Sequence, residues 1–285
     1  MRRIPMLVRQ GRHYRAADDL DRSTVRGLSL SRLFGTNCDR RVGDLPSMNE
    51  RCNGTPRATR VDGGFSKAER GAVYRAIFER RDVRRNFLPT PLPDHILMRV
   101  LTAAHHAGSV GFMQPWDFVV VRDRAIKSAV KKLFLTANAK AATRYQGKRA
   151  ALYRNLKLEG IEEAPINIGV TCSRQRGGPH VLGRTTVRDT DLYSTCCAIQ
   201  NLWLAARAEG IGVGWVSILD HSALKRVLRV PKSVTILAYL CLGYVSNFAR
   251  QPDLETAGWR ERIPLEHLIH YESWGNTMPE CKGKR

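Results

Sequence analysis

The 285-residue sequence predicts an α+β fold in which a mixed or antiparallel sheet is flanked by helices. Short runs rich in β-branched residues alternate with, and cluster between, long segments of helical periodicity. The composition is 43% hydrophobic, which is enough for a sizeable core. Neither GxGxxG nor GxxxxGK[ST] follows a predicted strand, so a dinucleotide-binding or P-loop fold is not expected.

The first 64 residues differ in composition from the rest of the chain. They contain many Arg residues and no Lys, together with Gly, Ser, Asn and Asp, and they show little periodicity. We expect residues 1–64 to be a poorly ordered, Arg-rich extension and residues 65–285 to form the folded domain. No apolar segment typical of a secretory signal is present, and several Asp residues argue against a transit peptide.

The folded part begins with two predicted helices. Ser66 and Glu69 have the spacing of a capping box, which predicts a helix to about Arg80. Asp94 follows Pro93 as a second expected N-cap, and an apolar stripe continues from there until Gly108. A loop over 109–116 then leads into the first predicted strand.

Alternating elements follow to the C-terminal part of the chain. Residues 118–121 are expected to form a buried strand, residues up to about 158 two Lys-rich helices, and residues 166–171 another strand. A long helix is expected over 192–209 with Gly210 as its C-terminal cap. The last predicted elements are a strand over 213–218, a short helix over 224–228 and a strand over 235–244.

Charge and cysteine content restrict the function classes. The formal net charge is +21, but the Lys and Arg residues are spread along the chain and accompany no nucleic-acid-binding signature. We expect no specific nucleic-acid partner, although a polyanion-binding or flavin-carrying module recruited through the basic extension is a non-catalytic alternative. No apolar run is long enough to cross a membrane, and seven cysteines without CxxC spacing favour a reducing, cytoplasmic location.

The motif Arg80-Arg81-Asp82-Val83-Arg84 carries the strongest chemical signal. Guanidinium groups bind phosphate through paired hydrogen bonds, and one carboxylate among them suits proton transfer. The alternative is a solvated Arg run, because cations at a helix C-terminus favour the helix dipole without a ligand. The adjacent His105 and His106 do not share a helix face, so no metal site is expected.

Several motifs together resemble the flavin-binding core of the nitroreductase superfamily and, more narrowly, the BluB family of 5,6-dimethylbenzimidazole synthases. The resemblance covers about residues 65–270. The narrower family is indicated by Gly111-Phe112-Met113-Gln114-Pro115-Trp116 together with Gly214-Trp215-Val216-Ser217. Broader matches are the Arg80–Arg84 motif and the segments 103–107, 156–160, 191–195 and 200–207.

The resemblance implies a nitroreductase-like homodimer that binds reduced FMN at its interface. With O2 as co-substrate, such proteins fragment FMNH2 to 5,6-dimethylbenzimidazole, the lower ligand of cobalamin. FMN is therefore consumed rather than retained, and a flavin reductase is the implied partner that supplies it. The implied catalytic residues are Asp82, as the proton-transferring acid, and Ser217, as a hydroxyl that hydrogen-bonds the flavin or its oxygen adduct.

The resemblance also implies which residues bind the flavin. Arg80, Arg81 and Arg84, with Ser109, correspond to the phosphate site. The remaining implied flavin contacts are Asp82, Val83, Met113, Gln114, Leu158 and Ser217. Arg250 is a weaker candidate for a further phosphate contact, and an ordinary surface arginine is the alternative. The rival function is an NAD(P)H-dependent FMN nitroreductase or flavin reductase, which shares this site but recycles the flavin; Asp82 and Ser217 favour the synthase.

Overall fold

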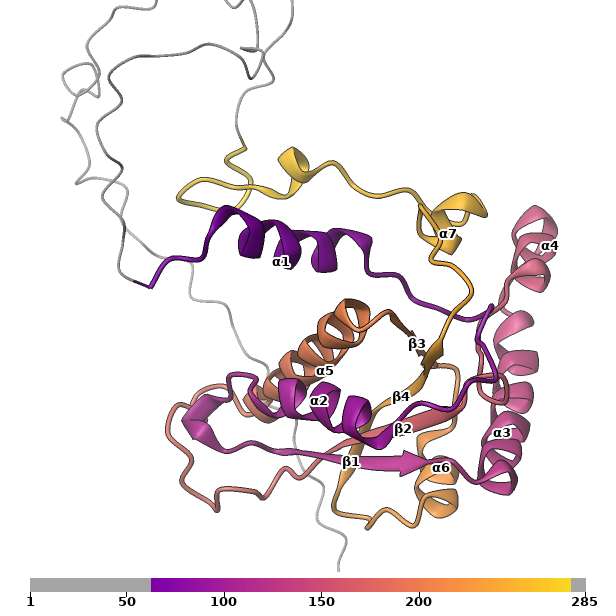
Figure 1. Cartoon of the computed structure of the whole chain (residues 1–285), viewed down its shortest axis with the longest axis horizontal. Helices are drawn as coiled ribbons and strands as arrows, with labels where there is room; N and C mark the ends of the chain where they lie inside the picture. The colour runs from indigo at the N-terminus through magenta and orange to yellow at the C-terminus, as the bar shows by residue number, and fades with distance from the viewer. Residues whose placement is uncertain (1–62, 278–285) are drawn as a thin grey trace, which may run out of the picture. The chain divides into compact units, whose positions relative to one another are not determined.

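A computed structural model describes residues 63–277 and confirms the α+β class (Figure 1). Its four-stranded sheet has the order β1-β2-β4-β3, and each pair of neighbouring strands is antiparallel. The strands are β1 (Trp116–Val121), β2 (Ile166–Cys172), β3 (Ile211–Trp215) and β4 (Thr235–Tyr244). Almost all of the extension predicted over 1–64 lies outside the described residues.

The helices agree with the sequence-based expectations to within a few residues. They are α1 (Lys67–Glu79), α2 (Asp94–His105), α3 (Arg124–Ala142), α4 (Gly147–Asn155), α5 (Thr190–Ala208), α6 (His221–Val227) and α7 (Asp253–Thr256), with the short 3-10 helices η2 (Val110–Phe112) and η3 (Leu265–Leu268). Among the described residues, none of these helices is long and apolar enough to cross a membrane.

The ends of α1 and α5 show why these helices begin and end where they do. The backbone N–H of Ser66 donates to the Glu69 carboxylate at 2.7 Å, and the Glu69 N–H donates to Ser66 Oγ at 3.3 Å. This is the predicted capping box. Gly210 follows the end of α5 with a φ of +74°, the left-handed conformation in which glycine carries no steric penalty.

Three predicted features differ from the structure. Asp94 is the first residue of α2 rather than its N-cap, which is Pro93, and its carboxylate pairs with Arg122 instead of capping the helix. β3 ends at Trp215 and not at residue 218. The expectation that β1 is buried is wrong, because β1 lies at an edge of the sheet with one neighbouring strand and leaves Val120 exposed.

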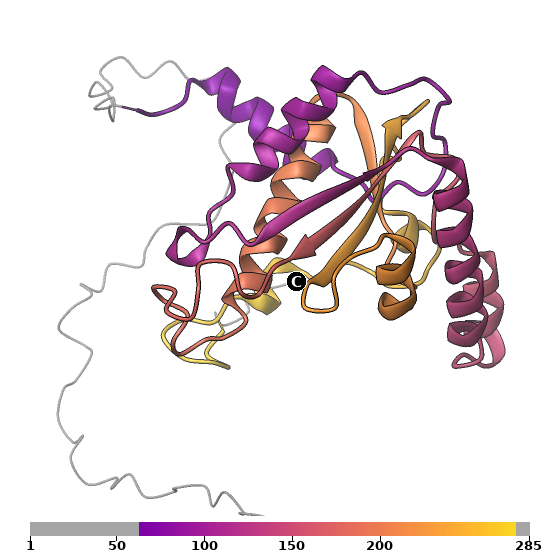
Figure 2. The same ribbon diagram turned by 90° about the horizontal axis from the view of Figure 1, so that it is seen from below.

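Alternate side chains of β4 belong to two buried clusters, one on each face of the sheet. Leu240 and Leu242 pack with α2 and α5 in one buried cluster, whereas Tyr239 and Cys241 pack with α3 and α6 in another. Successive side chains of a strand point to opposite faces, so a fully buried strand can supply both clusters. Figure 2 shows the sheet between these sets of helices. The β3 edge remains accessible to the segment that follows α1.

Candidate functional site

The segment after α1 is hydrogen-bonded to the β3 edge of the sheet. The Val83 N–H donates to the Val213 carbonyl at 2.9 Å, and the Trp215 N–H donates to Asp82 Oδ1, also at 2.9 Å. A parallel bridge joins Asp82 to Val213. The carboxyl predicted to be catalytic is therefore held by the backbone of a strand that lies far along the chain.

Gly214 makes this close approach possible. A Cβ atom on Gly214 would lie 1.9 Å from the Val83 carbonyl oxygen, far inside van der Waals contact. Only glycine fits between Val213 and Trp215 while the segment keeps its hydrogen bonds to β3. Sequence reasoning explained Gly210 as a helix cap and assigned no role to Gly214.

Burial and charge act on Asp82 in opposite directions. Burial raises the pKa of its carboxyl, whereas the Arg84 guanidinium, the Trp215 N–H and Arg80 oppose that rise, and the pKa remains above its ordinary value. Arg84 forms an ion pair with Asp82 Oδ2. A carboxyl that titrates closer to neutrality is better matched to general acid–base catalysis than an exposed aspartate.

The three arginines of the motif differ in their contacts. The Arg80 guanidinium lies 4.8 Å from the centroid of the Trp203 ring. Arg81 donates to the carbonyls of Phe78, Arg80 and Arg250. Arg84 is paired with Asp82, as described above.

Unused donors remain in this cluster. The Nε atoms of Arg81 and Arg84 are buried and have no hydrogen-bond partner among the described residues. The Arg80 guanidinium likewise has no hydrogen bond or ion pair among the described residues. Its contact is with the face of the Trp203 ring. Buried donors without partners are costly, so the cluster fits an anionic group that would accept from them.

Ser217 lies just beyond the end of β3. Val216 continues the pairing with β4 by donating to the Tyr239 carbonyl at 2.9 Å, and the chain then leaves the sheet. Ser217 is exposed and two residues from Trp215, whose N–H binds Asp82. Two residues of extended chain span at most about 7 Å, so Ser217 follows the end of β3 whose Trp215 N–H binds Asp82.

The loop before β1 forms a second cluster of predicted site residues. Ser109 Oγ accepts from the Gln114 N–H at 3.1 Å, and the Val110 N–H donates to Ser194 Oγ on α5 at 3.2 Å. Gln114 has a φ of +47°, which is unusual for a residue with a side chain. Met113 is buried. These contacts hold the loop against the N-terminal part of α5.

Within one chain, the two clusters are hydrogen-bonded to different parts of α5. The Ser109 loop is bound to Ser194, whereas the Arg80–Arg84 segment is bound to Trp203, whose Nε1–H donates to the Arg81 carbonyl at 3.1 Å. Nine residues of helix span about 14 Å. The two clusters are therefore anchored to α5 at positions about 14 Å apart, and we expect one phosphate group to contact only one of them in the same chain.

Two further predicted residues lie apart from the Ser109 loop. Leu158 is half-buried against the cluster of α3 and α6. Its neighbour Glu159 is buried and paired with Lys131 and Lys157, which anchors this connection. Arg250 is exposed and joins the arginine cluster through its backbone, since its carbonyl accepts from Arg81.

Trp203 is a residue of this site that sequence reasoning did not single out. It supports Arg80 through its ring and the Arg81 carbonyl through its indole N–H. The sequence signal available was its place in the matched segment 200–207, which by itself indicates only helix packing. In a separate contact, outside this site, His105 accepts a hydrogen bond from Trp116 Nε1 at 3.2 Å.

Known proteins resemble this chain in sequence and in fold. The sequence profile of the nitroreductase family matches residues 77–244. The chain belongs to the nitroreductase family. This nitroreductase-family chain is 42% identical to a 5,6-dimethylbenzimidazole synthase of Rhodospirillum rubrum, over 66% of the chain and 90% of the relative. It is 38% identical to one of Rhodobacter capsulatus, over 71% of the chain and 97% of the relative.

A solved structure shows the same fold. It is iodotyrosine deiodinase bound to FMN and 3-iodo-L-tyrosine, with a TM-score of 0.56 and 19% identity, covering 71% of this chain and all of that one. The resemblance inferred from the motifs is thus confirmed at the level of family and fold. The assignment of individual site residues stays a prediction.

Proposed function

We propose that this nitroreductase-family enzyme converts reduced FMN and O2 into 5,6-dimethylbenzimidazole, the lower ligand of cobalamin. The observation that carries the proposal is the identity of about two residues in five to synthases of that name over nearly their whole length. The described site adds a carboxyl with a raised pKa within an arginine cluster. Reduced flavin supplies the electrons that O2 accepts.

Arg80 and Arg84 are the proposed phosphate ligands. Arg80 has its guanidinium free of hydrogen bonds among the described residues, and Arg84 keeps a buried, unpartnered Nε beside its ion pair with Asp82. Arg81 has a different role in this proposal. Its hydrogen bonds to three carbonyls connect the end of α1 with Arg250. Its Nε–H is the donor that remains without a partner among the described residues.

Asp82 is the proposed proton carrier. Its Oδ1 accepts from the Trp215 N–H and its Oδ2 from Arg84, so the carboxyl is held in one orientation while a proton is gained or lost. Ser217 presents a hydroxyl from the same strand end. That hydroxyl can donate to an oxygen on which negative charge develops.

We propose a homodimer because the two clusters can form one flavin site only if each comes from a different copy of the chain. The outward face of α5 carries an exposed stripe at helical spacing, made of Tyr193, Cys196, Cys197 and Gln200. If two copies pair antiparallel along this stripe, the Ser194 end of one helix lies beside the Trp203 end of the other. The Ser109 loop of one chain then reaches the arginine cluster of its partner.

Helix α1 supports the same arrangement. No residue of α1 is buried, and the helix exposes the apolar side chains of Val73, Tyr74, Ile77 and Phe78. An exposed apolar row on a helix is typical of an association surface. In the proposed dimer, Met113 and Gln114 approach the flavin from one chain, and Asp82, Val83, Leu158 and Ser217 approach it from the other. Arg250 is a further candidate for a contact with the phosphate.

The reaction also requires a source of reduced flavin, for which we propose a separate flavin reductase. A reducing cytoplasm suits both the reduced substrate and the chain, whose described cysteines Cys172, Cys196, Cys197 and Cys241 are free thiols.

The deciding experiment supplies chemically reduced FMN and air to the purified full-length chain and analyses the products by mass spectrometry. We expect 5,6-dimethylbenzimidazole and loss of an equivalent amount of flavin. If the chain instead oxidises NAD(P)H stoichiometrically with a nitroaromatic compound while FMN stays intact, it is a nitroreductase and the proposal is wrong.

A further inference from the structure

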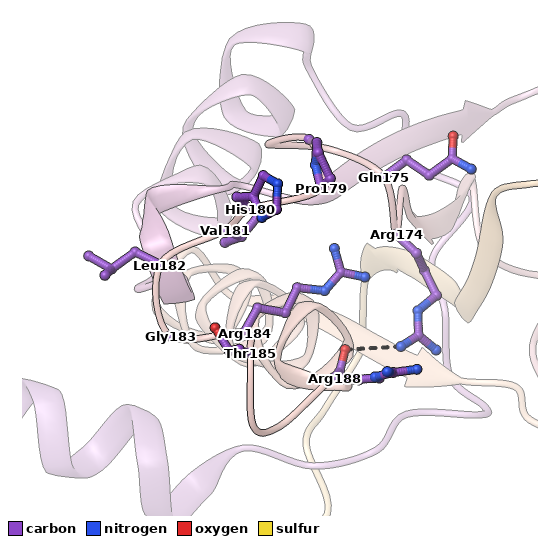
Figure 3. Close-up of a pocket in the computed structure, with 11 residues that line it drawn as sticks. Arg174, Gln175, Pro179, His180, Val181, Leu182, Gly183, Arg184, Thr185 and Arg188 are labelled. Atoms are coloured by element: carbon purple, nitrogen blue, oxygen red, sulfur yellow. Dashed lines mark hydrogen bonds between the residues drawn. The ribbon is translucent and has the colours of Figure 1, made fainter.

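A second basic site lies in the loop between β2 and α5. Residues 174–188 enclose a cavity of about 990 Å³, shown with its lining side chains in Figure 3. Its charged lining consists of Arg174, Arg184 and Arg188, with His180 at the same loop. No carboxylate is among the lining residues, so the described surface of this cavity presents only positive charge.

Two acids at the start of α5 pair with the arginines of the lining. Asp191 on the first turn of α5 is fully buried, and its Oδ2 accepts from Arg174 Nε at 3.1 Å and pairs with Arg184 at 3.0 Å. Asp189 binds a second nitrogen of Arg174 at 2.6 Å. A buried acid shared by two guanidinium groups fixes their planes before any ligand arrives.

Several donors of this cluster have no partner among the described residues. Arg184 uses one nitrogen of its guanidinium for Asp191, and the Arg188 side chain takes part in no ion pair there. The Thr190 hydroxyl, at the start of α5, is buried and has no hydrogen-bond partner in the described part of the chain. The N-terminus of a 19-residue helix adds a further favourable field for an anion.

Part of the remaining wall of the cavity is apolar, and Gln175 and Thr185 add polar side chains to the lining. Pro179, Val181 and Leu182 line it, and Leu182 is 83% exposed. The loop also packs on the segment before β1, since a Cβ on Gly111 would lie 2.5 Å from Val181. The cavity is therefore larger than a single anion requires and combines a basic end with an apolar wall.

We propose that this cavity binds a phosphate group, either free or carried by a nucleotide whose ring system lies on Pro179, Val181 and Leu182. Arg184 and Arg188 are the proposed phosphate ligands, and Asp191 is a positioning residue that orients Arg184. Within one chain the site is separate from the arginine cluster at Asp82, because Asp191 and Trp203 are twelve residues apart on α5, or about 18 Å. In the proposed dimer this end of α5 lies beside the Trp203 end of the partner, so the test has to be made with the flavin site already filled. This inference does not depend on which reaction the flavin undergoes.

The test uses the full-length chain saturated with oxidised FMN, so that the first site is filled. Inorganic phosphate and NADP+ are titrated separately by calorimetry into the wild type and the variant R184Q/R188Q. We expect the double variant to bind either probe at least about tenfold more weakly, which corresponds to about 1.4 kcal/mol. Tighter binding of NADP+ than of phosphate identifies a nucleotide site, and equal binding a site for free phosphate.

Matched controls separate this site from the flavin site. Arg226→Gln removes an exposed arginine on α6 and should leave both titrations unchanged. Quenching of flavin fluorescence should be the same in all variants. Should R184Q/R188Q fold poorly, Arg188→Gln alone is used, since that side chain supports no described ion pair. Unaltered binding in the variants, or no binding by the wild type, overturns the proposal.

Discussion

At Asp82, burial and hydrogen bonding act on one carboxyl in opposite directions. Burial raises its pKa and is opposed by Arg84, the Trp215 N–H and Arg80, with a net rise. A raised pKa means that the deprotonated form appears at higher pH than for an exposed aspartate. If this form accepts a proton during the reaction, the rate is lost on acidification at a pH above the ordinary pKa of aspartate.

Asp82→Asn tests this role. The amide oxygen can still accept from the Trp215 N–H, so flavin binding should change little, while product formation falls by about 10² or more. The acid limb of the wild-type pH–rate profile should disappear in the residual activity. Rates are measured by product mass spectrometry and binding by flavin fluorescence. Asp94→Asn, an exposed site paired with Arg122, is the control; full activity of Asp82→Asn would contradict the assignment.

Gly214→Ala tests the close approach of the Asp82 segment to β3. The added Cβ would lie 1.9 Å from the Val83 carbonyl oxygen, so the segment has to move. We expect a loss of about 3 kcal/mol in the free energy of unfolding, measured by urea denaturation, together with weaker flavin binding.

Gly71→Ala is the matched control for that substitution. A Cβ atom added to Gly71, inside α1, would meet no other atom within 4 Å, so alanine should stabilise the helix by about 0.5–1 kcal/mol. Equal effects at the two glycines would show that the approach at Gly214 is unimportant.

At the scale of elements, the C-terminal segment is attached to the helices by aromatic contacts. Trp259 packs edge-on against Tyr145 at a centroid distance of 5.2 Å, and the Arg149 guanidinium lies 3.7 Å from its ring centroid. The carbonyl of Arg250, in the same segment, accepts a hydrogen bond from Arg81. The segment thus connects α4 with the arginine cluster.

Trp259→Ala should loosen this segment. Loss of the aromatic and cation–π contacts is expected to cost about 2 kcal/mol of unfolding free energy and to increase hydrogen exchange over residues 250–277. Flavin affinity should fall because Arg81 loses part of its support. Trp274→Ala, at a ring that is 91% exposed, should have a much smaller effect. Similar exchange in the two variants would refute the attachment.

At the scale of the whole molecule, α5 separates two half-sites within each chain. The arginine cluster contacts Trp203, and the Ser109 loop contacts Ser194. The proposed dimer unites each half-site with the complementary one of the other copy. Activity then depends on a pair of chains rather than on one.

Mixing two inactive variants tests this arrangement. One variant carries Asp82→Asn and the other Ser109→Ala with Gln114→Ala, and the two are unfolded and refolded together. Random pairing makes about half of the dimers mixed, and each mixed dimer has one intact site of two, so about a quarter of wild-type activity should return. Each variant refolded alone is the control. No recovery would mean that one chain supplies the complete site.

Much of the fold was predictable because its signals are local. The capping box at Ser66, the cap at Gly210 and the apolar run 235–244 involve residues a few positions apart, and these features place elements within one or two residues. The family was also predictable, since its motifs are short. Boundaries failed where the partner was distant, as at Asp94, whose carboxylate pairs with Arg122.

By itself, the sequence determined the order of helices and strands, the nitroreductase family and the list of candidate site residues. Only the tertiary structure decided that Arg81 binds carbonyls, that Gly214 admits the segment at Asp82, and that the Ser109 loop and the arginine cluster are bound to positions about 14 Å apart on α5. The physical reason is that these contacts join residues far apart in the chain. Their distances depend on how the sheet and helices pack, which local propensity does not encode.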